Sequence, residues 1–269
     1  MKIIDTHAHI FPDKIAEKAV KSISDFYDGA KMGNIGSAEK LIKSGNEVGV
    51  NKYLVFSTAT ALHQVESINS FIIEQINKYK QFIGLGTIIV GYKDFESELK
   101  RLKDNGINGI KLHPDFQKFD FDSKLLYPVY DALAQLNMFV LTHAGDYRYE
   151  YSNPKKIAKV AIDFPKLDII AAHFGGWSQW DIARDCLNLP NVYFDTSSTI
   201  GFDGAENAKK AFETFNNSHI FFGTDFPMWS HKEEMNNIKK LGLSDDVFEK
   251  VMYKNFCEFY KKYDNAELI

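Results

Sequence analysis

Eight short apolar runs, separated by helical patterns, constrain the fold of this 269-residue chain more than any other feature. The runs are rich in β-branched and aromatic residues, and most are apolar throughout, which is typical of strands buried on both faces. They are KIIDTH from Lys2, KYLVFST from Lys52, FIGLGTII from Phe82, INGIKLH from Ile107, MFVLTH from Met138, LDIIAAH from Leu167, NVYFDTS from Asn191 and HIFFGTD from His219. We therefore expect eight strands.

Apolar residues with three-and-four spacing predict helices between these runs. The predicted stripes are Val65, Ile68, Ile72, Ile76 and Tyr79; Phe95, Leu99 and Leu102; Val129, Leu133 and Leu136; and Ala205, Ala208, Phe212 and Phe215. Asp94 is expected to cap the second helix and Gly106 to end it. Pro128 fits only the first turn of the third helix, and Ser244 is expected to cap a last helix.

This alternation predicts an α/β fold of the (β/α)8 or TIM-barrel type, in one domain over residues 1–269. A doubly wound open sheet competes with it, but such a sheet usually carries a glycine-rich loop after its first strand. The first run here is followed by AHIFPDK instead. About 40 residues separate the first two strands, and a connection of that length at the active face of a barrel often serves as a lid or a substrate wall.

Composition and charge exclude several classes of protein. The net charge is −4 and the three arginines, Arg101, Arg148 and Arg184, are scattered, so nucleic acid is not an expected partner. We find no signal peptide and no apolar run long enough to cross a membrane. Cys186 and Cys257 lie 71 residues apart (257 − 186), which indicates reduced thiols in a cytoplasmic protein rather than a disulfide framework.

The segment IIDTHAHI, at the end of the first strand, is the first candidate for chemistry. Alternate side chains of a strand point to the same side, so Asp5, His7 and His9 share one face. Two imidazoles at one strand edge can bind a divalent ion, most often zinc. The alternative is that they are only polar residues at the ragged end of a strand.

Histidines gather at the ends of other strands as well. Five of the eight histidines end predicted strands: His7, His9, His113, His143 and His173. In a barrel the reactive face lies at the carboxyl ends of the strands, so imidazoles from strands one and five would converge with Asp225 of strand eight. Such a set matches a catalytic zinc site with an open position for water, and we expect one divalent ion, zinc by preference. The expected ligands are His7, His9, His143 and Asp225.

Five short motifs carry a resemblance to a known family: DTHAH, KLHP, THAG, HFGG and GTDFP, in this order along the strands. The chain resembles the amidohydrolase superfamily, and most closely its amidohydrolase 2 branch, which also contains aminocarboxymuconate-semialdehyde decarboxylase and related decarboxylases. The likeness extends to KNFCEFY, at the position of the family's last helix. The resemblance implies the same four metal ligands, a role for His173 beside the metal on water or substrate, and a supporting role for Asp5.

Two residues of the fourth strand are open to more than one interpretation. In binuclear members of the family a carboxylated lysine bridges two metals, and Lys111 could do this. Its alternative is a buried ammonium paired with a carboxylate such as Asp5 or Asp225. His113 could contact substrate at the mouth of the barrel, or it could donate a hydrogen bond to the backbone.

The loops after strands five, six and eight suggest how a substrate is held. Trp177 and Trp229 could form an apolar wall, beside the glycine pair of FGGW, whose backbone could approach a ligand closely. Alternatively, the two tryptophans pack only on neighbouring helices. Arg148 is the one arginine expected on the active rim and could bind a substrate carboxylate. Its alternative is a surface salt bridge with Asp146 or Glu150.

These features predict a metal-dependent hydrolase that acts on a small, carboxylate-bearing substrate. Zinc would lower the pKa of its water and polarise the carbonyl of an ester, lactone or amide, while Asp225 and His173 handle protons. A non-oxidative decarboxylase on the same residues is the alternative, although the familiar decarboxylases of the branch are longer chains, which favours hydrolysis. A barrel that only binds a ligand is a third hypothesis, which the full ligand set argues against. Assembly into a homo-oligomer is left open.

Overall fold

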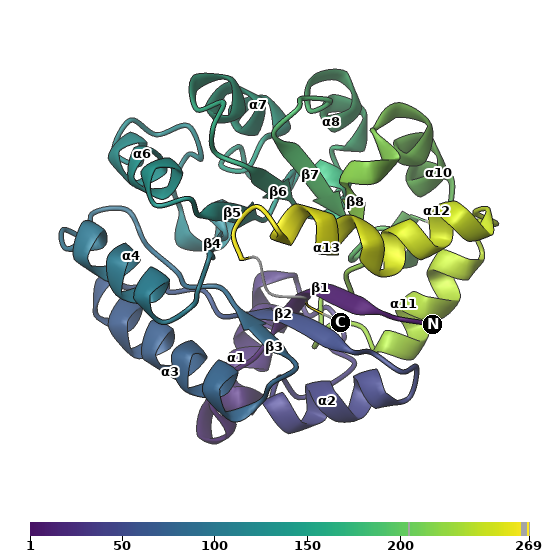
Figure 1. Ribbon diagram of the computed structural model, residues 1–269, viewed down its shortest axis with the longest axis horizontal. Coiled ribbons are helices and arrows are strands. Elements are labelled where there is room, and N and C mark those ends of the chain that lie inside the picture. The colour runs from purple at the N-terminus through teal and green to yellow at the C-terminus, as the bar shows by residue number, and fades with distance from the viewer. Residues whose placement is uncertain (204, 265–267, 269) are drawn as a thin grey trace.

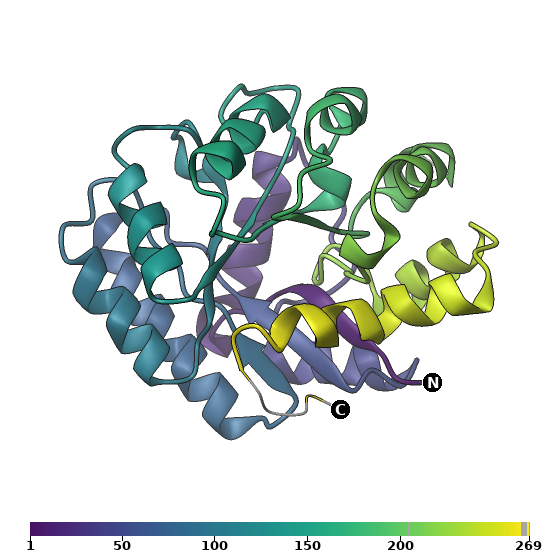
Figure 2. The same ribbon diagram turned by 45° about the horizontal axis from the view of Figure 1, so that its top comes forward.

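The computed structural model describes residues 1–203, 205–264 and 268. Its strands are β1 (Ile4–His9), β2 (Lys52–Phe56), β3 (Phe82–Gly84), β4 (Gly109–Leu112), β5 (Phe139–Thr142), β6 (Ile169–Ala171), β7 (Val192–Asp195) and β8 (Ile220–Phe221). Each of them overlaps one of the eight predicted runs. They gather at the centre of the molecule, and the helices surround them (Figures 1 and 2).

The strands are parallel and close into a barrel. Hydrogen bonds join them in two series, β1-β2-β3 and β4-β5-β6-β7-β8. A parallel bridge between Gly86 and Ile110 connects β3 to β4, and a second bridge between Ala8 and Phe226 connects β1 to the segment after β8. The backbone N–H of His9 donates to the Phe226 carbonyl at 2.7 Å across this second seam. The predicted (β/α)8 barrel is therefore confirmed.

Helices follow each strand and form the outer layer. The α-helices of the described residues are α1 (Asp13–Phe26), α2 (Ala38–Asn46), α3 (Val65–Lys78), α4 (Phe95–Asp104), α5 (Pro114–Gln117), α6 (Tyr127–Gln135), α7 (Pro154–Asp163), α8 (Trp180–Cys186), α9 (Ile200–Asp203), α10 (Ala205–Thr214), α11 (His231–Lys239), α12 (Asp245–Glu249) and α13 (Asn255–Tyr260). Short turns are η1 (Leu62–Gln64), η2 (His173–Gly175), η3 (Asn217–His219) and the π-helical η4 (Lys250–Lys254).

The predicted helix boundaries hold with one exception. Pro128 lies in the first turn of α6, and Gly106, at φ +80°, ends α4. The Ser244 hydroxyl accepts from the Val247 N–H at 3.5 Å and caps α12. The capping expected of Asp94 is wrong: its backbone, at φ −90° and ψ 28°, lacks the extended conformation of an N-cap, and its side chain accepts no such hydrogen bond.

The last helix closes one end of the barrel. Phe256, Phe259 and Tyr260 of α13 pack against side chains inside the barrel, such as Leu141 and Phe221. Figure 1 looks onto this end, and α13, in yellow, crosses it. Burying each phenylalanine contributes about 1.5–3 kcal/mol. Because this helix fills the amino-terminal end of the strands, a ligand enters from the opposite end.

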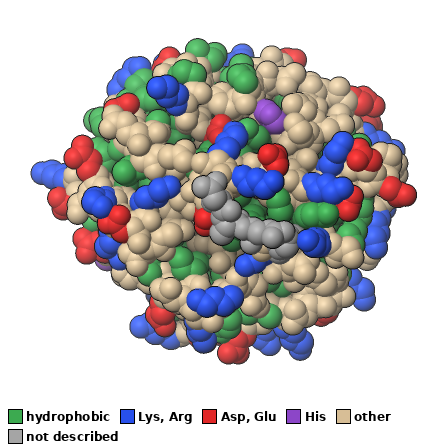
Figure 3. All heavy atoms as spheres, in the orientation of Figure 1, with side chains coloured by type: hydrophobic (Ala, Val, Ile, Leu, Met, Phe, Trp, Pro, Cys, Tyr) green, Lys and Arg blue, Asp and Glu red, His purple; other side chains and the backbone are tan. Residues whose placement is uncertain are grey.

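The long connection after β1 folds into α1 and α2. In Figure 2, α1 (purple) lies behind the strands, on the side away from α13. Residues of α1 line the main cavity, so this connection forms part of the cavity wall. On the face shown in Figure 3, Lys and Arg side chains alternate with Asp and Glu and form no basic stripe. The described residues contain no helix that is both long and apolar enough to span a membrane.

Candidate active site

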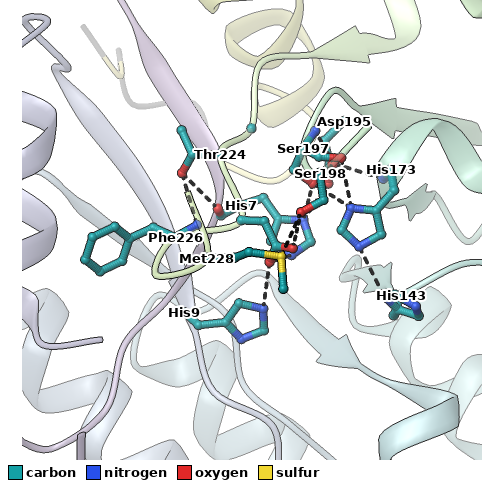
Figure 4. Close-up of polar contacts among 12 residues, drawn as sticks. His7, His9, His143, His173, Asp195, Ser197, Ser198, Thr224, Phe226 and Met228 are labelled. Atoms are coloured by element: carbon teal, nitrogen blue, oxygen red, sulfur yellow. Dashed lines mark hydrogen bonds and ion pairs between the residues drawn. The ribbon is translucent and has the colours of Figure 1, made fainter. Parts of the chain in front are cut away.

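At the carboxyl end of the barrel, two histidines of β1 lie beside one carboxylate that follows β8. Figure 4 shows these histidines, His7 and His9, with His143 and His173 in the same region. The Asp225 Oδ1 atom lies 3.4 Å from His7 Nε2 and 3.4 Å from His9 Nε2. The period of two in a strand puts both imidazoles on the same side. The Asp225 N–H donates to the His7 carbonyl at 2.8 Å, so the barrel seam itself fixes the carboxylate beside the two rings.

Asp195, at the end of β7, sets the proton position on His7. Its Oδ2 lies 2.8 Å from His7 Nδ1, so Nδ1 carries the proton and the Nε2 lone pair faces Asp225. A carboxylate on the far nitrogen of a histidine is the usual support of a metal ligand. Burial by itself raises the pKa of the Asp195 carboxyl, but the charge and hydrogen bond of His7 outweigh it and hold that pKa well below its usual range.

His173 stands beside this cluster, at the end of β6. Its Nδ1 lies 3.0 Å from the Ser197 carbonyl oxygen and therefore donates, which leaves the Nε2 lone pair free to accept. The His173 N–H donates to Asp195 Oδ1 at 3.1 Å, so one carboxylate holds both His7 and His173. Burial lowers the pKa of His9 and of His173 to about 4. Both rings are therefore neutral near pH 7.

His143 and His113 form a stacked pair on the neighbouring wall, with ring centroids 4.1 Å apart. His143 Nδ1 lies 3.1 Å from His173 Nε2, and His143 Nε2 is buried without a hydrogen-bond partner among the described residues. His113 lines the cavity. Its Nδ1 accepts from the Phe116 N–H at 3.2 Å, and its Nε2 lies 3.0 Å from the Tyr27 hydroxyl. The bond from His113 to the backbone that was considered runs in the opposite direction, because the ring accepts from a backbone N–H instead of donating to a carbonyl.

A divalent ion fits these donors. In a tetrahedral site with metal–nitrogen bonds of about 2.0–2.1 Å, ligand atoms lie about 3.4 Å apart. The Nε2–Oδ1 distances from His7 and His9 to Asp225 are both 3.4 Å, longer than a typical hydrogen bond. His7, His173 and Asp225 each offer one ligand atom within 4.8 Å of the others. His143, the fourth expected ligand, is not part of this group, and its Nδ1 lies 3.1 Å from His173 Nε2.

Lys111 lies on the floor of the cavity as a buried ammonium. Its Nζ is 3.4 Å from His7 Nε2 and 4.9 Å from the centre of the Phe56 ring. Burial lowers its pKa to about 8, although Asp195 and Asp225 partly oppose this effect. It forms no ion pair with a carboxylate among the residues described. Pairing with Asp5 is not observed, because Asp5 instead accepts from His231 Nε2 at 2.9 Å.

Arg148 does not lie on the cavity. Its guanidinium donates to the buried Asp146 carboxylate at 2.7 Å, to the Phe26 carbonyl at 2.8 Å and to Asp28 at 3.0 Å. The salt bridge with Asp146, which was one alternative, is therefore the one present. Because Phe26 and Asp28 lie at the end of α1, Arg148 ties the wall helix to the loop after β5. The Arg148 guanidinium is therefore not placed to contact a substrate in the cavity.

The two tryptophans also lie outside the cavity lining. Trp177 packs edge-on against Tyr27, with centroids 5.4 Å apart, and Trp229 packs against Phe202 at 5.4 Å. Trp229 Nε1 donates to the Ser198 hydroxyl, which in turn donates to Asp225 Oδ2 at 2.6 Å. Trp229 thus supports the carboxylate rather than forming a wall. The glycine pair of FGGW is likewise absent from the lining, and a Cβ on its second member would collide with the backbone of the loop that follows.

The cavity above the histidines has a volume of about 650 Å³. His7, His9, His143, His173, Lys111 and Asp225 form its polar floor. Sequence reasoning missed Asp195 and the serines that follow it. The signal was an acidic residue inside the apolar run NVYFDTS, because a carboxylate at the end of a buried strand requires a partner.

A family model described as Amidohydrolase matches residues 4–262, nearly the entire chain. No curated protein sequence matches this chain. Among solved structures, an uncharacterised TIM-barrel protein of Bordetella bronchiseptica is similar at a TM-score of 0.81 and 20% identity, covering 98% of this chain and 99% of that one.

Two further solved structures are of proteins named for an activity. A dihydroxybenzoic acid decarboxylase of Polaromonas, with bound manganese and the inhibitor 2-nitroresorcinol, has a TM-score of 0.75 and 14% identity, over 100% of this chain and 99% of that one. A probable 2-pyrone-4,6-dicarboxylic acid hydrolase of Acinetobacter baumannii, with citric acid bound, has a TM-score of 0.72 and 17% identity, over 97% and 99%. At these identities the structures establish a shared fold.

Proposed function

The chain belongs to the amidohydrolase family, and from this premise we propose that it is a metal-dependent hydrolase. Its substrate is a small, carboxylate-bearing molecule whose ester, lactone or amide carbonyl is attacked by water. The observation that carries the proposal is the equal 3.4 Å separation of Asp225 Oδ1 from His7 Nε2 and His9 Nε2. We propose that residues 1–269 form one catalytic domain.

One zinc ion per chain is proposed, because imidazoles and a carboxylate are its usual ligands at catalytic sites. The proposed ligands are His7, His9, His143 and Asp225. When bound, a divalent ion activates water and polarises the carbonyl under attack. Asp195 keeps the His7 proton on Nδ1, and the Ser198 hydroxyl occupies Asp225 Oδ2, so the Nε2 atoms of His7 and His9 face Asp225 Oδ1.

His173 is proposed to take a proton from water and return it to the leaving group, with Asp225 as the second proton acceptor. Support comes from the Ser197 carbonyl, which holds the Nδ1 proton of His173 and leaves Nε2 as the basic atom. The ring lines the cavity floor, within reach of a substrate. Lys111 is proposed to meet the substrate carboxylate, since it is the cation on that floor. We propose a cytoplasmic location, because Cys186 and Cys257 form no disulfide.

A non-oxidative decarboxylase is the second candidate. The similarity to the manganese-containing dihydroxybenzoic acid decarboxylase favours it, and the same floor could hold a hydroxyaryl acid. There Lys111 would face the carboxylate that leaves as carbon dioxide, and His173 Nε2 would take the proton of a ring hydroxyl and return it to the ring carbon that loses the carboxylate.

Metal analysis followed by a substrate panel tests the proposal. After mild dialysis we expect about one equivalent of zinc per chain, and release of acid from lactones, esters or amides that carry a carboxylate. Carbon dioxide from hydroxyaryl acids would establish the decarboxylase instead. Two equivalents of metal with a carboxylated Lys111 would refute the single-metal site. Absence of metal and of turnover in every preparation would indicate a barrel that only binds ligand.

A further inference from the structure

The wall of the cavity carries an apolar stripe on α1. Ile15, Ala19 and Ile23 are spaced four residues apart, so they lie on one face of the helix, and all three line the cavity. Ile68 and Phe71 of α3 line the same cavity. We call these five residues the α1–α3 groove.

The α1 residues of this groove lie outside the hydrophobic core. Ile15, Ala19 and Ile23 belong to neither core cluster and are not among the side chains packed against one, whereas Ile68 and Phe71 are packed against the core. Ile15 remains 44% exposed. A contiguous apolar surface that faces a cavity and lies outside the hydrophobic core is typical of a ligand-binding groove.

The groove is held in place at both ends of α1. At the carboxyl end, Arg148 donates to the Phe26 carbonyl at 2.8 Å, and the Tyr27 hydroxyl lies 3.0 Å from His113 Nε2. Before the helix, the Phe11 N–H donates to the Gly36 carbonyl at 2.7 Å. The wall is therefore built before a ligand arrives, which lowers the entropy cost of binding.

The size and charge of the cavity narrow the choice of ligand. Its volume of about 650 Å³ is roughly four times the ~150 Å³ that accommodates one benzene molecule. Among the described residues, the lining contains Lys14, Lys18 and Lys111 but only one carboxylate, Asp225. The site therefore has room for more than a single ring and favours an anion over a cation.

We propose that the substrate is an extended, largely apolar carboxylate, whose alkyl or aryl chain lies in the α1–α3 groove while its reacting group lies on the floor beside His173. The assignment of the reacting group rests on the proposed function. The preference for an apolar chain does not, because it follows from the groove alone and is measurable without turnover.

Binding of hexanoate, octanoate and decanoate to the full chain, by isothermal titration calorimetry with and without added zinc, tests the inference. Each methylene that enters the groove should tighten binding about fourfold, so octanoate should bind about 16-fold more tightly than hexanoate. Ile15→Ser should reduce this factor. Ile162→Ser is the matched control, because Ile162 is 66% exposed on α7 and lies outside the cavity lining.

A dissociation constant that is independent of chain length would overturn the inference, as would equal factors for Ile15→Ser and Ile162→Ser. A steep chain-length dependence in a protein that binds no metal and turns nothing over would support the groove while refuting the proposed function. Metal binding and turnover of short substrates, with no preference for chain length, would support the proposed function while refuting the groove.

Discussion

Replacing Asp195 with asparagine should weaken zinc binding through the proton on His7. Oδ1 of Asp195 accepts from the N–H groups of His173 and Ser197, both at 3.1 Å, so the amide oxygen of an asparagine would stay on that side. Its NH₂ group would then face His7 Nδ1, where Oδ2 now accepts at 2.8 Å. Two donors cannot pair, so Nδ1 must accept and the His7 proton must move to Nε2.

A proton on Nε2 blocks the atom that faces Asp225 Oδ1 at 3.4 Å. Loss of such a supporting carboxylate typically costs 10–100-fold in metal affinity, which corresponds to about 1.4–2.7 kcal/mol. Competition with a chromophoric chelator measures the dissociation constant of zinc for each variant. Asp168→Asn is the matched control, because Asp168 pairs with Lys262 at 2.8 Å on the side of the barrel near α13. Zinc affinity for Asp195→Asn equal to that of this control would refute the reasoning.

Three further outcomes are expected. His173→Asn should keep the zinc while kcat falls by roughly 10²–10⁴-fold, and loss of metal by elemental analysis would make His173 a ligand instead. Arg148→Ala leaves the buried Asp146 unpaired, so urea unfolding should show a loss of about 3 kcal/mol with metal content unchanged. Burial, aided by Asp225 and Asp5, raises the pKa of Glu234 to about 8, whereas the unfolded value is about 4.3. Stability should therefore fall as pH rises between these values, and Glu234→Gln should flatten that fall; an unchanged slope would exclude a buried neutral carboxyl.

The fold could be predicted from the sequence because its signals are local and repeat along the chain. Each strand is an apolar run followed by a helical stripe, and this repetition specifies the barrel without knowledge of any single contact. The same geometry brought His7, His9 and Asp225 to one rim, since the carboxyl ends of parallel strands meet there. His173 also lies at the carboxyl end of the sixth strand and lines the cavity, as the sequence predicts.

The direction of loop side chains could not be predicted in this way. Arg148 follows β5 on the active rim, yet its guanidinium turns toward Asp146 and α1, because a buried carboxylate attracts it more strongly than open solvent does. Trp229 lies outside the cavity lining because its indole N–H donates a hydrogen bond to the Ser198 hydroxyl. Asp195 was missed for a different reason. Its strand is otherwise apolar, so the run was interpreted as a buried strand and its single acidic residue was not considered separately.

The seam between β1 and the segment after β8 fixes when the site can form in a growing chain. Asp225, whose N–H donates to the His7 carbonyl, is synthesised 218 residues after His7 (225 − 7). The aromatic residues of α13 that complete the barrel interior come later still. A metal ion that needs ligands from β1 and from the segment after β8 therefore binds only after all eight strands have been synthesised, and its binding free energy stabilises only the closed barrel.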